Sequence, residues 1–276
     1  MAIALVDDPR FHVSADLKEL EEIQDTKERQ QTYDAIVKEI RQLIELGTFE
    51  WAWLPDNARP LSCKLVLKVK YHADGSYDKH KARLTVRGCF QVPGRDFEET
   101  FAPTAGQTTS RILDAVAVLR GWKLFQGDIA NAFCQSLVDV PVYIELPRGI
   151  DVFDPIASEL DKRKATRRRA LRLVKALYGL RQSPRLFYKD LAKTLETAGF
   201  VRSNYEPCLF WRKDSMGKKV YCLCYVDDLK CCGDSSESFE KLQTALSLRY
   251  GLPPFEPLTS FTGVAYNRVS CTQVVC

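Results

Sequence analysis

Two short apolar runs enclose a pair of adjacent aspartates, and this arrangement constrains the fold more than any other feature of the sequence. Residues 220–226 precede Asp227 and Asp228, and residues 229–232 follow them. Short apolar runs that meet at a polar turn predict two strands joined by a hairpin. We therefore predict that both carboxylates lie at the tip of a β-hairpin.

Hydrophobic periodicity predicts a mixture of helices and strands in the rest of the chain. Helices are expected over residues 33–44, after Thr109 with Ile112, Ala115, Val116 and Leu119 on one side, from Pro184 to Gly199, and over residues 239–250. Strands are expected over residues 65–71 and 81–90 around an Asp74-Gly75 turn, up to Asp128, and over residues 142–146. This order indicates an α+β protein and not a doubly wound sheet.

Basic residues are distributed unevenly, although the net charge is only +4. Residues 162–185 contain ten bases and no acids, and residues 64–95 contain eight bases and two acids. Such blocks are typical of phosphate-binding surfaces, and a solvated charged face is the alternative.

The sequence features that indicate a cellular compartment favour an intracellular protein. No apolar run reaches the roughly 18 residues of a membrane span, and the N-terminus lacks the basic start of a signal peptide. The ten cysteines are interpreted as reduced thiols, because no secretory signal accompanies them. Cys222, Cys224, Cys231 and Cys232 lack zinc spacing and are expected to fill strand positions as small apolar groups. The expected location is the cytoplasm, in particles, or the nucleus, with no membrane partner.

A third carboxylate strengthens a catalytic interpretation of the aspartate pair. Alone, an Asp-Asp turn is more often a solvated turn. Asp128, however, follows an apolar run, so a strand end would place it where it can join Asp227 and Asp228. Clustered carboxylates repel one another unless a cation is present, and Mg²⁺ prefers oxygen ligands. Two such ions are suited to phosphoryl transfer.

Several segments resemble the reverse transcriptases of Ty1/copia retrotransposons. They are YVDD at 225–228, KARLTVRGCFQVPGRDFEETFAPTA at 81–105, GWKLFQGDIANAFCQ at 121–135, LVKALYGLRQSPRLFYKDL at 173–191 and EPCLFWR at 206–212. They occur in the family's order over roughly residues 27–270. The resemblance implies a right-hand polymerase core with fingers and palm, in which helices pack on one face of the palm sheet.

The resemblance also implies roles for individual residues. Asp128, Asp227 and Asp228 match the catalytic metal ligands for two Mg²⁺ or Mn²⁺ ions, with the Ile129 carbonyl as a further ligand. The residues implied in substrate binding are Phe133, which excludes the ribose 2′-hydroxyl, Tyr178, Gly179, Gln182, Lys64, Lys81 and Arg83. Those expected to bind nucleic acid are Arg167, Arg168, Arg169, Arg181 and Arg185. Residues 260–264 stand where the family has its primer grip, with a different sequence.

The implied function is the addition of deoxynucleoside triphosphates to a primer on an RNA or DNA template. Residues 1–26 are expected to be a lead-in, and residues 27–276 a fingers and palm domain without thumb or RNase H segments. Other segments of a retrotransposon polyprotein are expected partners. Two alternatives stay open: a truncated or domesticated fragment that binds nucleic acid without polymerising, and a simpler metal-dependent nucleotidyltransferase or nuclease.

Overall fold

The computed structural model describes residues 25–71, 74–147 and 169–266. The chain divides into a first unit, Met1–Thr100 with Phe133–Leu186, and a second unit, Phe101–Ala132 with Phe187–Cys276. The described part contains four α-helices, and all its named strands pair antiparallel, which confirms the α+β class. Within these ranges no helix has the length and apolar character needed to cross a bilayer.

In the first unit, helix α2 (Thr26–Glu45) packs on the hairpin of β2 (Cys63–Tyr71) and β3 (Tyr77–Val86). The Asp25 side chain caps the helix by accepting a hydrogen bond from the Lys27 N–H at 2.7 Å. Its apolar stripe, which includes Ile40 and Leu43, is buried in one cluster with Leu84 of β3. The predicted amphipathic helix is therefore confirmed. Strand β3 ends before the expected residue 90, because a 3₁₀ turn, η2 (Gly88–Phe90), follows it.

The first unit also contains a three-stranded sheet in the order β1 (Phe49–Trp53), β6 (Arg169–Lys175) and β5 (Leu137–Ile144). Strand β5 begins five residues before the expected residue 142, since its first residue already pairs with the end of β6. Strand β6 was not predicted, because its arginines obscure the pattern. Its leucines at 171 and 173 are buried, whereas Arg172 between them is exposed.

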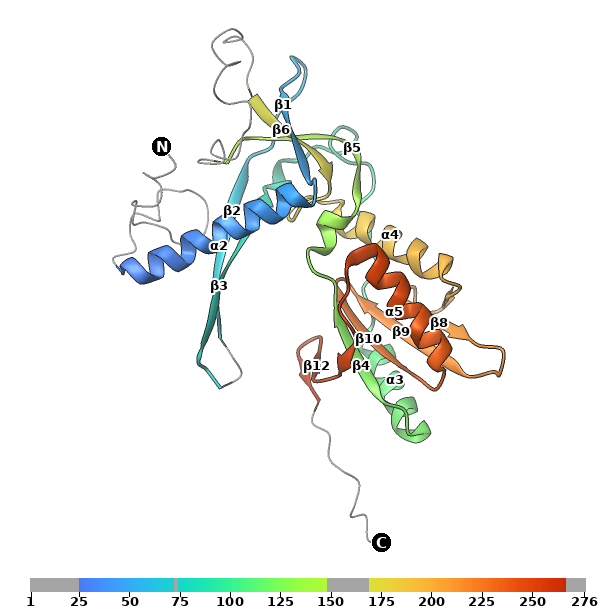
Figure 1. The fold of residues 1–276 in the computed structure, drawn as a ribbon. Helices are drawn as coiled ribbons and strands as arrows, with labels where there is room; N and C mark the ends of the chain where they lie inside the picture. Colours follow the sequence, from blue (N-terminus) through green and yellow to red (C-terminus); the bar gives the residue numbers. More distant parts are fainter. Residues whose placement is uncertain (1–24, 72–73, 148–168, 267–276) are drawn as a thin grey trace. The chain divides into compact units, whose positions relative to one another are not determined.

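The second unit is built on a six-stranded antiparallel sheet (Figure 1). Its order is β11 (Glu256–Pro257), β4 (Leu124–Asp128), β10 (Asp228–Gly233), β9 (Lys219–Tyr225), β8 (Leu209–Lys213) and β7 (Val201–Arg202). Its helices are α3 (Gln107–Arg120), most of α4 (Ser183–Thr197) and α5 (Ser236–Tyr250). A small hairpin, β12 (Ser260–Phe261) and β13 (Val264–Ala265), follows β11. The strands ending at Asp128 and flanking Asp227, and the helices near Pro184 and over residues 239–250, are confirmed.

Helices cover both faces of this sheet. Phe239 of α5 packs on Phe125 of β4, with ring centroids 4.9 Å apart. Phe125 pairs with Cys231, whereas the next residue pair along the two strands is Gln126 and Lys230. Because neighbouring residues on a strand point to opposite faces, Lys230 lies on the other face, where it bonds to α3. The expectation of helices on one face is therefore wrong.

Helix α3 forms where predicted but buries a different side. Ser110, Leu113 and Ala117 are buried, whereas Ile112 and Leu119 of the expected apolar side are 57% and 85% exposed. The polar Ser110 faces the sheet because it accepts a hydrogen bond from Lys230 at 2.9 Å. The contact with the buried Lys230 therefore determines which side of α3 faces the sheet, and the largest apolar side chains of the helix do not.

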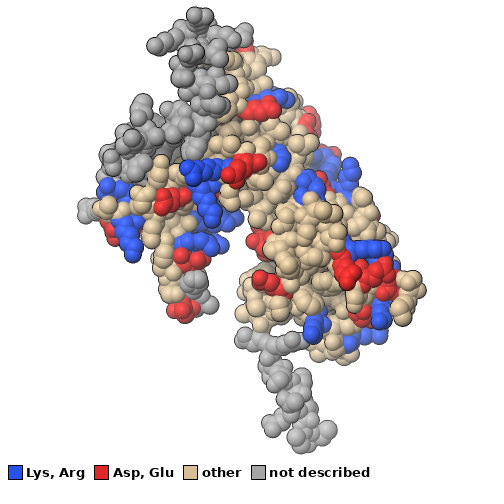
Figure 2. All heavy atoms as spheres, in the orientation of Figure 1, with Lys and Arg blue, Asp and Glu red and all other residues tan. Residues whose placement is uncertain are grey.

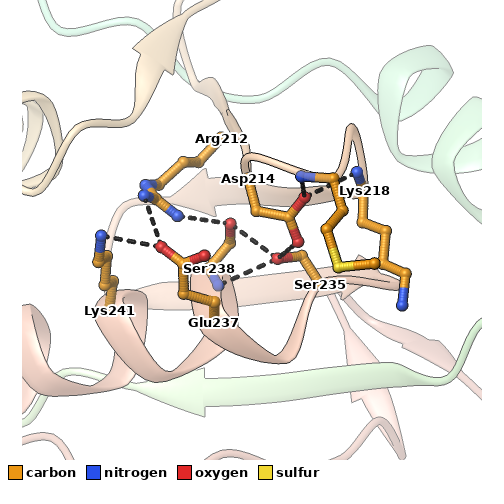
Figure 3. A network of polar contacts seen from close by, with 8 residues as sticks. Arg212, Asp214, Lys218, Ser235, Glu237, Ser238 and Lys241 are labelled. Carbon is orange, nitrogen blue, oxygen red and sulfur yellow. Dashed lines mark hydrogen bonds and ion pairs between the residues drawn. The ribbon is translucent and has the colours of Figure 1, made fainter.

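A polar network fixes the start of α5 to the β8–β9 hairpin (Figure 3). The Ser235 hydroxyl caps the helix by accepting from the Ser238 N–H at 3.1 Å, and it donates to Asp214 at 2.6 Å. Arg212 donates to the Ser238 hydroxyl at 2.7 Å and to Glu237 at 3.1 Å. Blue and red spheres are interleaved over this side of the second unit (Figure 2). The network joins α5 to the end of β9 that lies opposite the aspartate hairpin.

Candidate functional site

The aspartate hairpin turns within two residues. Tyr225 at the end of β9 pairs with Asp228 at the start of β10, so Val226 and Asp227 form the turn. Val226 has a positive φ of 55°, which is unusual for a β-branched residue. Such strained positions cost on the order of 1–3 kcal/mol and cluster at functional sites. The strands beside the turn are buried at Leu223, Cys224 and Leu229, so a rigid base holds it.

Asp128 lies directly opposite Asp228. The two residues are cross-strand partners of β4 and β10, and such partners project from the same face of a sheet. The Ile129 N–H donates a hydrogen bond of 3.0 Å to the Asp227 carbonyl, which ties the end of β4 to the turn. The second unit therefore brings together all three predicted aspartates and Ile129. Only Asp227 lies within the turn, because Asp228 already begins the strand.

The three carboxylates create a locally negative site. Partial burial raises the pKa of Asp228, and the negative charges of Asp227 and Asp128 raise it further. In the described ranges, no three Asp, Glu, His or Cys side chains are arranged so that they could hold one metal ion. Repulsion between the negative charges explains why the side chains of Asp128, Asp227 and Asp228 do not converge on one point. The three carboxylates nevertheless suit Mg²⁺, because this ion prefers oxygen ligands and would offset their negative charge.

The first unit gathers most of the predicted substrate-binding residues on one face of the β2–β3 hairpin. Lys64, Lys81 and Arg83 share this face, since Lys64 pairs with Thr85 and Val66 with Arg83. The Arg83 guanidinium stacks over the Tyr178 ring, 4.6 Å from its centroid. Phe133 meets the same ring edge-on, with centroids 5.3 Å apart. A layered cluster of cations and aromatic rings results.

Gly179 brings the Tyr178 segment against this hairpin. Its φ is +90°, and a Cβ atom there would lie 2.0 Å from the Val86 carbonyl oxygen. The Val86 N–H also donates a 2.8 Å hydrogen bond to the Tyr178 carbonyl. Only glycine permits this approach, so Gly179 positions the Tyr178 ring.

Gln182, Arg181 and Arg185 are engaged within the first unit. Gln182 is fully buried; its amide donates to the Asp96 carbonyl at 2.9 Å and accepts from Gln91 at 3.0 Å. A direct contact of Gln182 with substrate would break these bonds. Arg181 donates to the Gly88 carbonyl, and Arg185 pairs with Glu99 and Asp139.

The same β2–β3 face carries further cations. Lys68 lies opposite Lys81, and Lys70 lies opposite Lys79. Like charges directly opposite each other destabilise a sheet, so these pairs favour an anionic ligand. Figure 2 shows Lys and Arg side chains gathered beside α2 and β3.

The basic stretch from residue 162 is described only from Arg169 onward. There the Arg169 guanidinium lies 5.6 and 5.8 Å from the ring centroids of Trp51 and Trp53 on β1. Arg167 and Arg168 lie outside the described residues.

Comparison with known proteins identifies the family of the chain. Residues 47–275 match the family described as reverse transcriptase (RNA-dependent DNA polymerase). The chain belongs to this reverse transcriptase family. The match includes all three aspartates and the Phe133–Tyr178–Arg83 cluster, so the predicted resemblance is confirmed.

Several relatives of this chain are Pol or Gag-Pol polyproteins of Ty1/copia-type retrotransposons. It is 35% identical over 229 residues to the Retrovirus-related Pol polyprotein from transposon RE1 of Arabidopsis thaliana, covering 82% of this chain and 15% of that protein. It is 28% identical over 249 residues to the polyprotein from transposon TNT 1-94 of Nicotiana tabacum, covering 90% of this chain and 18% of that protein. The Transposon Ty1-DR5 Gag-Pol polyprotein of Saccharomyces cerevisiae is 25% identical over 228 residues, which cover 82% of this chain and 12% of that protein. The chain thus spans less than a fifth of the length of these relatives.

The cysteines beside the reverse transcriptase hairpin are buried and free of disulfides. Cys222, Cys224, Cys231 and Cys232 are each at most 2% exposed. Burial raises the pKa of the Cys232 thiol to about 12. Their predicted role as small apolar residues is confirmed.

Two residues near the carboxylates were missed by the sequence analysis. Lys230 is fully buried, although it stands within the apolar run after Asp228. Gln126 stands two residues before Asp128 and bonds to residues 259 and 260. A lysine inside an otherwise apolar strand was the available signal, since buried lysines are rare unless paired.

Proposed function

We propose that this chain is an RNA-directed DNA polymerase domain, which extends a primer with deoxynucleotides along an RNA or DNA template. The observation that carries the proposal is the cross-strand pair of Asp128 and Asp228 beside the strained turn at Asp227. Phosphoryl transfer depends on positioning and charge neutralisation, and carboxylates at the ends of two paired strands could hold the cations that neutralise the charge. The family match gives this arrangement its chemical context.

Two Mg²⁺ or Mn²⁺ ions would be held by Asp128, Asp227 and Asp228, with the Ile129 carbonyl as a further ligand. When bound, they would supply neutralisation of the triphosphate and activation of the primer 3′-oxygen. The carboxylates bind and orient them. The hydrogen bond between the Ile129 N–H and the Asp227 carbonyl keeps the two ligand-bearing strands in register.

The first unit supplies the residues proposed to select the incoming nucleotide. Phe133 would pack on the sugar and exclude a 2′-hydroxyl, and Tyr178 supports it at a centroid distance of 5.3 Å. Lys64, Lys81 and Arg83 share one face of the β2–β3 hairpin and would attract the triphosphate. Gly179 would set the pocket edge, and Gln182 would support it from within the fold.

Template and primer would bind mainly through phosphate contacts. Candidate residues are the cations of the β2–β3 face and Arg167, Arg168, Arg169, Arg181 and Arg185. The first unit would correspond to fingers and the second to the palm, so residues 27–276 would form one fingers and palm domain. Other segments of a retrotransposon polyprotein are proposed partners, because the relatives are polyproteins.

Primer extension on poly(rA)/oligo(dT) with Mg²⁺ or Mn²⁺ tests the proposal. We expect incorporation of dTTP that disappears when the metal is chelated. Binding of the template-primer without extension would support the alternative of a nucleic-acid-binding fragment. Metal-dependent degradation of the strand without extension would support a nuclease.

A further inference from the structure

A second cross-strand pair lies next to the aspartates on the same face of the sheet. Asp128 pairs with Asp228, and two residues further along the strands Gln126 pairs with Lys230. Strand residues rise about 3.3 Å each, so the second pair lies roughly 7 Å from the first. The polar character of this second pair is unexplained by the carboxylate chemistry.

Lys230 is bonded on several sides although it is fully buried. Its ammonium pairs with Asp114 and donates to the Ser110 hydroxyl at 2.9 Å, both on α3. It also donates to the Tyr266 hydroxyl at 2.9 Å, and that hydroxyl donates to Asp114 at 2.9 Å. Burying an ion pair rarely stabilises a fold more than apolar residues would. Through these bonds Lys230 connects α3, β10 and Tyr266.

Gln126 holds the other end of the same segment. Its side-chain oxygen accepts hydrogen bonds from the Thr259 N–H at 2.8 Å and from the Ser260 N–H at 3.2 Å. The Tyr266 N–H donates to the Thr259 carbonyl at 2.8 Å, which closes the segment into a loop. Both ends of residues 259–266 are thus fixed by the pair next to the aspartates.

The segment between these anchors has a buried base and an exposed tip. Phe261 is 3% exposed, and the Lys230 ammonium lies 5.4 Å from its ring centroid. The chain turns at Thr262 and Gly263, which both have positive φ, as in a tight hairpin. Gly263 and the strand β13 that follows are exposed. A firmly held hairpin therefore presents its tip to solvent on the face that carries Asp128 and Asp228.

We propose that Lys230 and Gln126 are positioning residues, which fix the hairpin of residues 259–266 so that it holds the primer 3′ end in line with the carboxylates. This inference rests on the proposed polymerase function. It assigns no contact with substrate to Lys230 or Gln126; they act through the hairpin. The alternative is that both residues serve stability alone.

Removing one hydroxyl tests the anchor with little change in packing. Tyr266→Phe deletes the group that bonds to Lys230 and Asp114. Tyr188→Phe is the matched control, since the Tyr188 hydroxyl in the same unit donates to the Pro207 carbonyl at 2.9 Å and accepts from Arg202 at 3.3 Å. Rapid-quench primer extension measures the burst rate constant and the burst amplitude, and a separate titration measures template-primer affinity.

We expect the burst rate constant of Tyr266→Phe to fall on the order of tenfold, because small misplacements of reacting groups cost up to roughly a hundredfold. Affinity should change less than about twofold, since phosphate contacts dominate it. Gln126→Met should behave in the same way, and Tyr188→Phe should match the unaltered chain. A purely structural role would lower only the burst amplitude, and that result would overturn the proposal.

Hydrogen exchange of the backbone amides tests whether Lys230 and Gln126 hold residues 259–266, and this test does not depend on polymerase activity. The amides of residues 259–266 should exchange faster in Tyr266→Phe and in Gln126→Met than in Tyr188→Phe. Equal exchange in all three variants would overturn the anchor even in an active enzyme. Failure of the unaltered chain to extend any primer would instead overturn the proposed function, while the exchange rates would still decide whether the hairpin is anchored.

Discussion

Asp228 lies beside two other negative charges and is itself partly desolvated. Burial raises its pKa, and Asp227 and Asp128 raise it further. A raised pKa means that the folded chain binds the proton more tightly than the unfolded chain does. The stability from this proton is fully present below the unfolded pKa and is lost as the pH rises through the folded pKa. At neutral pH the ionised Asp228 carboxylate therefore destabilises the metal-free protein.

Asp228→Asn should accordingly raise the melting temperature of the metal-free protein at pH 7. The advantage should shrink as the pH falls and vanish below the unfolded pKa of about 3.9, where the aspartate is protonated in both the folded and the unfolded chain. Thermal unfolding of both proteins across this pH range measures the difference. An advantage of the same size at every pH would contradict the electrostatic explanation.

Mg²⁺ provides the complementary measurement, because an ion that binds only the folded state stabilises it. It should raise the melting temperature of the unaltered chain and have less effect on Asp228→Asn. Asp214→Asn is a suitable control, since Asp214 lies at the turn between β8 and β9, at the other end of β9. An equal response of all three proteins to Mg²⁺ would argue against a site at the hairpin.

Phe133 is the residue proposed to reject ribonucleotides. Phe133→Val should raise ribonucleotide incorporation relative to deoxyribonucleotide incorporation and leave metal binding unchanged. Burying a 2′-hydroxyl without a partner costs roughly 1–3 kcal/mol, which corresponds to about ten- to a hundredfold in selectivity. Single-nucleotide incorporation with both sugars measures the ratio.

The edge-on contact of Phe133 with Tyr178 supplies the competing explanation, a purely structural ring. In that case the substitution would lower stability and reduce activity with both sugars alike. An unchanged sugar ratio in a folded, active variant would therefore exclude the selective role of Phe133.

At the scale of elements, the β2–β3 hairpin carries an unfavourable charge arrangement in the free chain. Lys68 faces Lys81, and Lys70 faces Lys79, so like charges lie opposite each other on this face, although Lys79 also pairs with Asp78 at 3.3 Å. The lysines on this face of the β2–β3 hairpin therefore suit the binding of a polyanion more than they stabilise the first unit.

Replacing Lys68 and Lys70 by Gln should weaken template-primer binding and slightly stabilise the free protein. The slope of log affinity against log salt should become shallower by about 0.9 for each duplex phosphate that the variant no longer neutralises. Binding titrations at several salt concentrations measure this slope. Lys241→Gln is the control, because Lys241 is paired with Glu237 at 3.0 Å in the second unit. Equal slopes for both variants would contradict a nucleic-acid-binding role of the hairpin.

Most elements could be predicted from periodicity, but their exact faces and ends could not. The apolar stripe of α2 was sufficient to predict this helix, because Ile40 and Leu43 are buried in one cluster with Leu84 of β3, and the bonds of Glu39 and Thr32 to β3 add to this apolar contact. The buried side of α3 was mispredicted, because Ser110 and Asp114 bond to a lysine 116 or more residues later in the sequence. Strand β6 was missed, since two arginines and a lysine interrupt its apolar residues. The buried side of α3 and the formation of β6 both depend on residues far away in the sequence.

At the scale of the whole molecule, the proposed activity depends on both units. The carboxylates belong to the second unit, whereas Phe133, Tyr178 and Arg83 belong to the first. Each unit is assembled from two stretches of the chain, so local patterns alone could not show which residues belong to the same unit. The resemblance to known sequences supplied the roles proposed for these residues, and the structure adds the anchoring pair of Lys230 and Gln126, which no motif indicated.

The relatives also place the chain in a larger context. Their polyproteins are more than five times as long as the matched region, which covers 12–18% of the three polyproteins named above. Any template choice or processivity should therefore be measured both in the matched region alone and together with the other segments of the polyprotein. The chemistry proposed for the carboxylates is local and is testable in this chain by itself.

Addition of one nucleotide opposite a defined template base tests the central claim most directly. With Mg²⁺ or Mn²⁺, the unaltered chain should add only the deoxynucleotide complementary to the RNA template base. Asp227→Asn should abolish addition and leave template-primer affinity unchanged or slightly raised, whereas Asp214→Asn should retain addition. Untemplated addition, or addition by Asp227→Asn at the rate of the unaltered chain, would contradict the account.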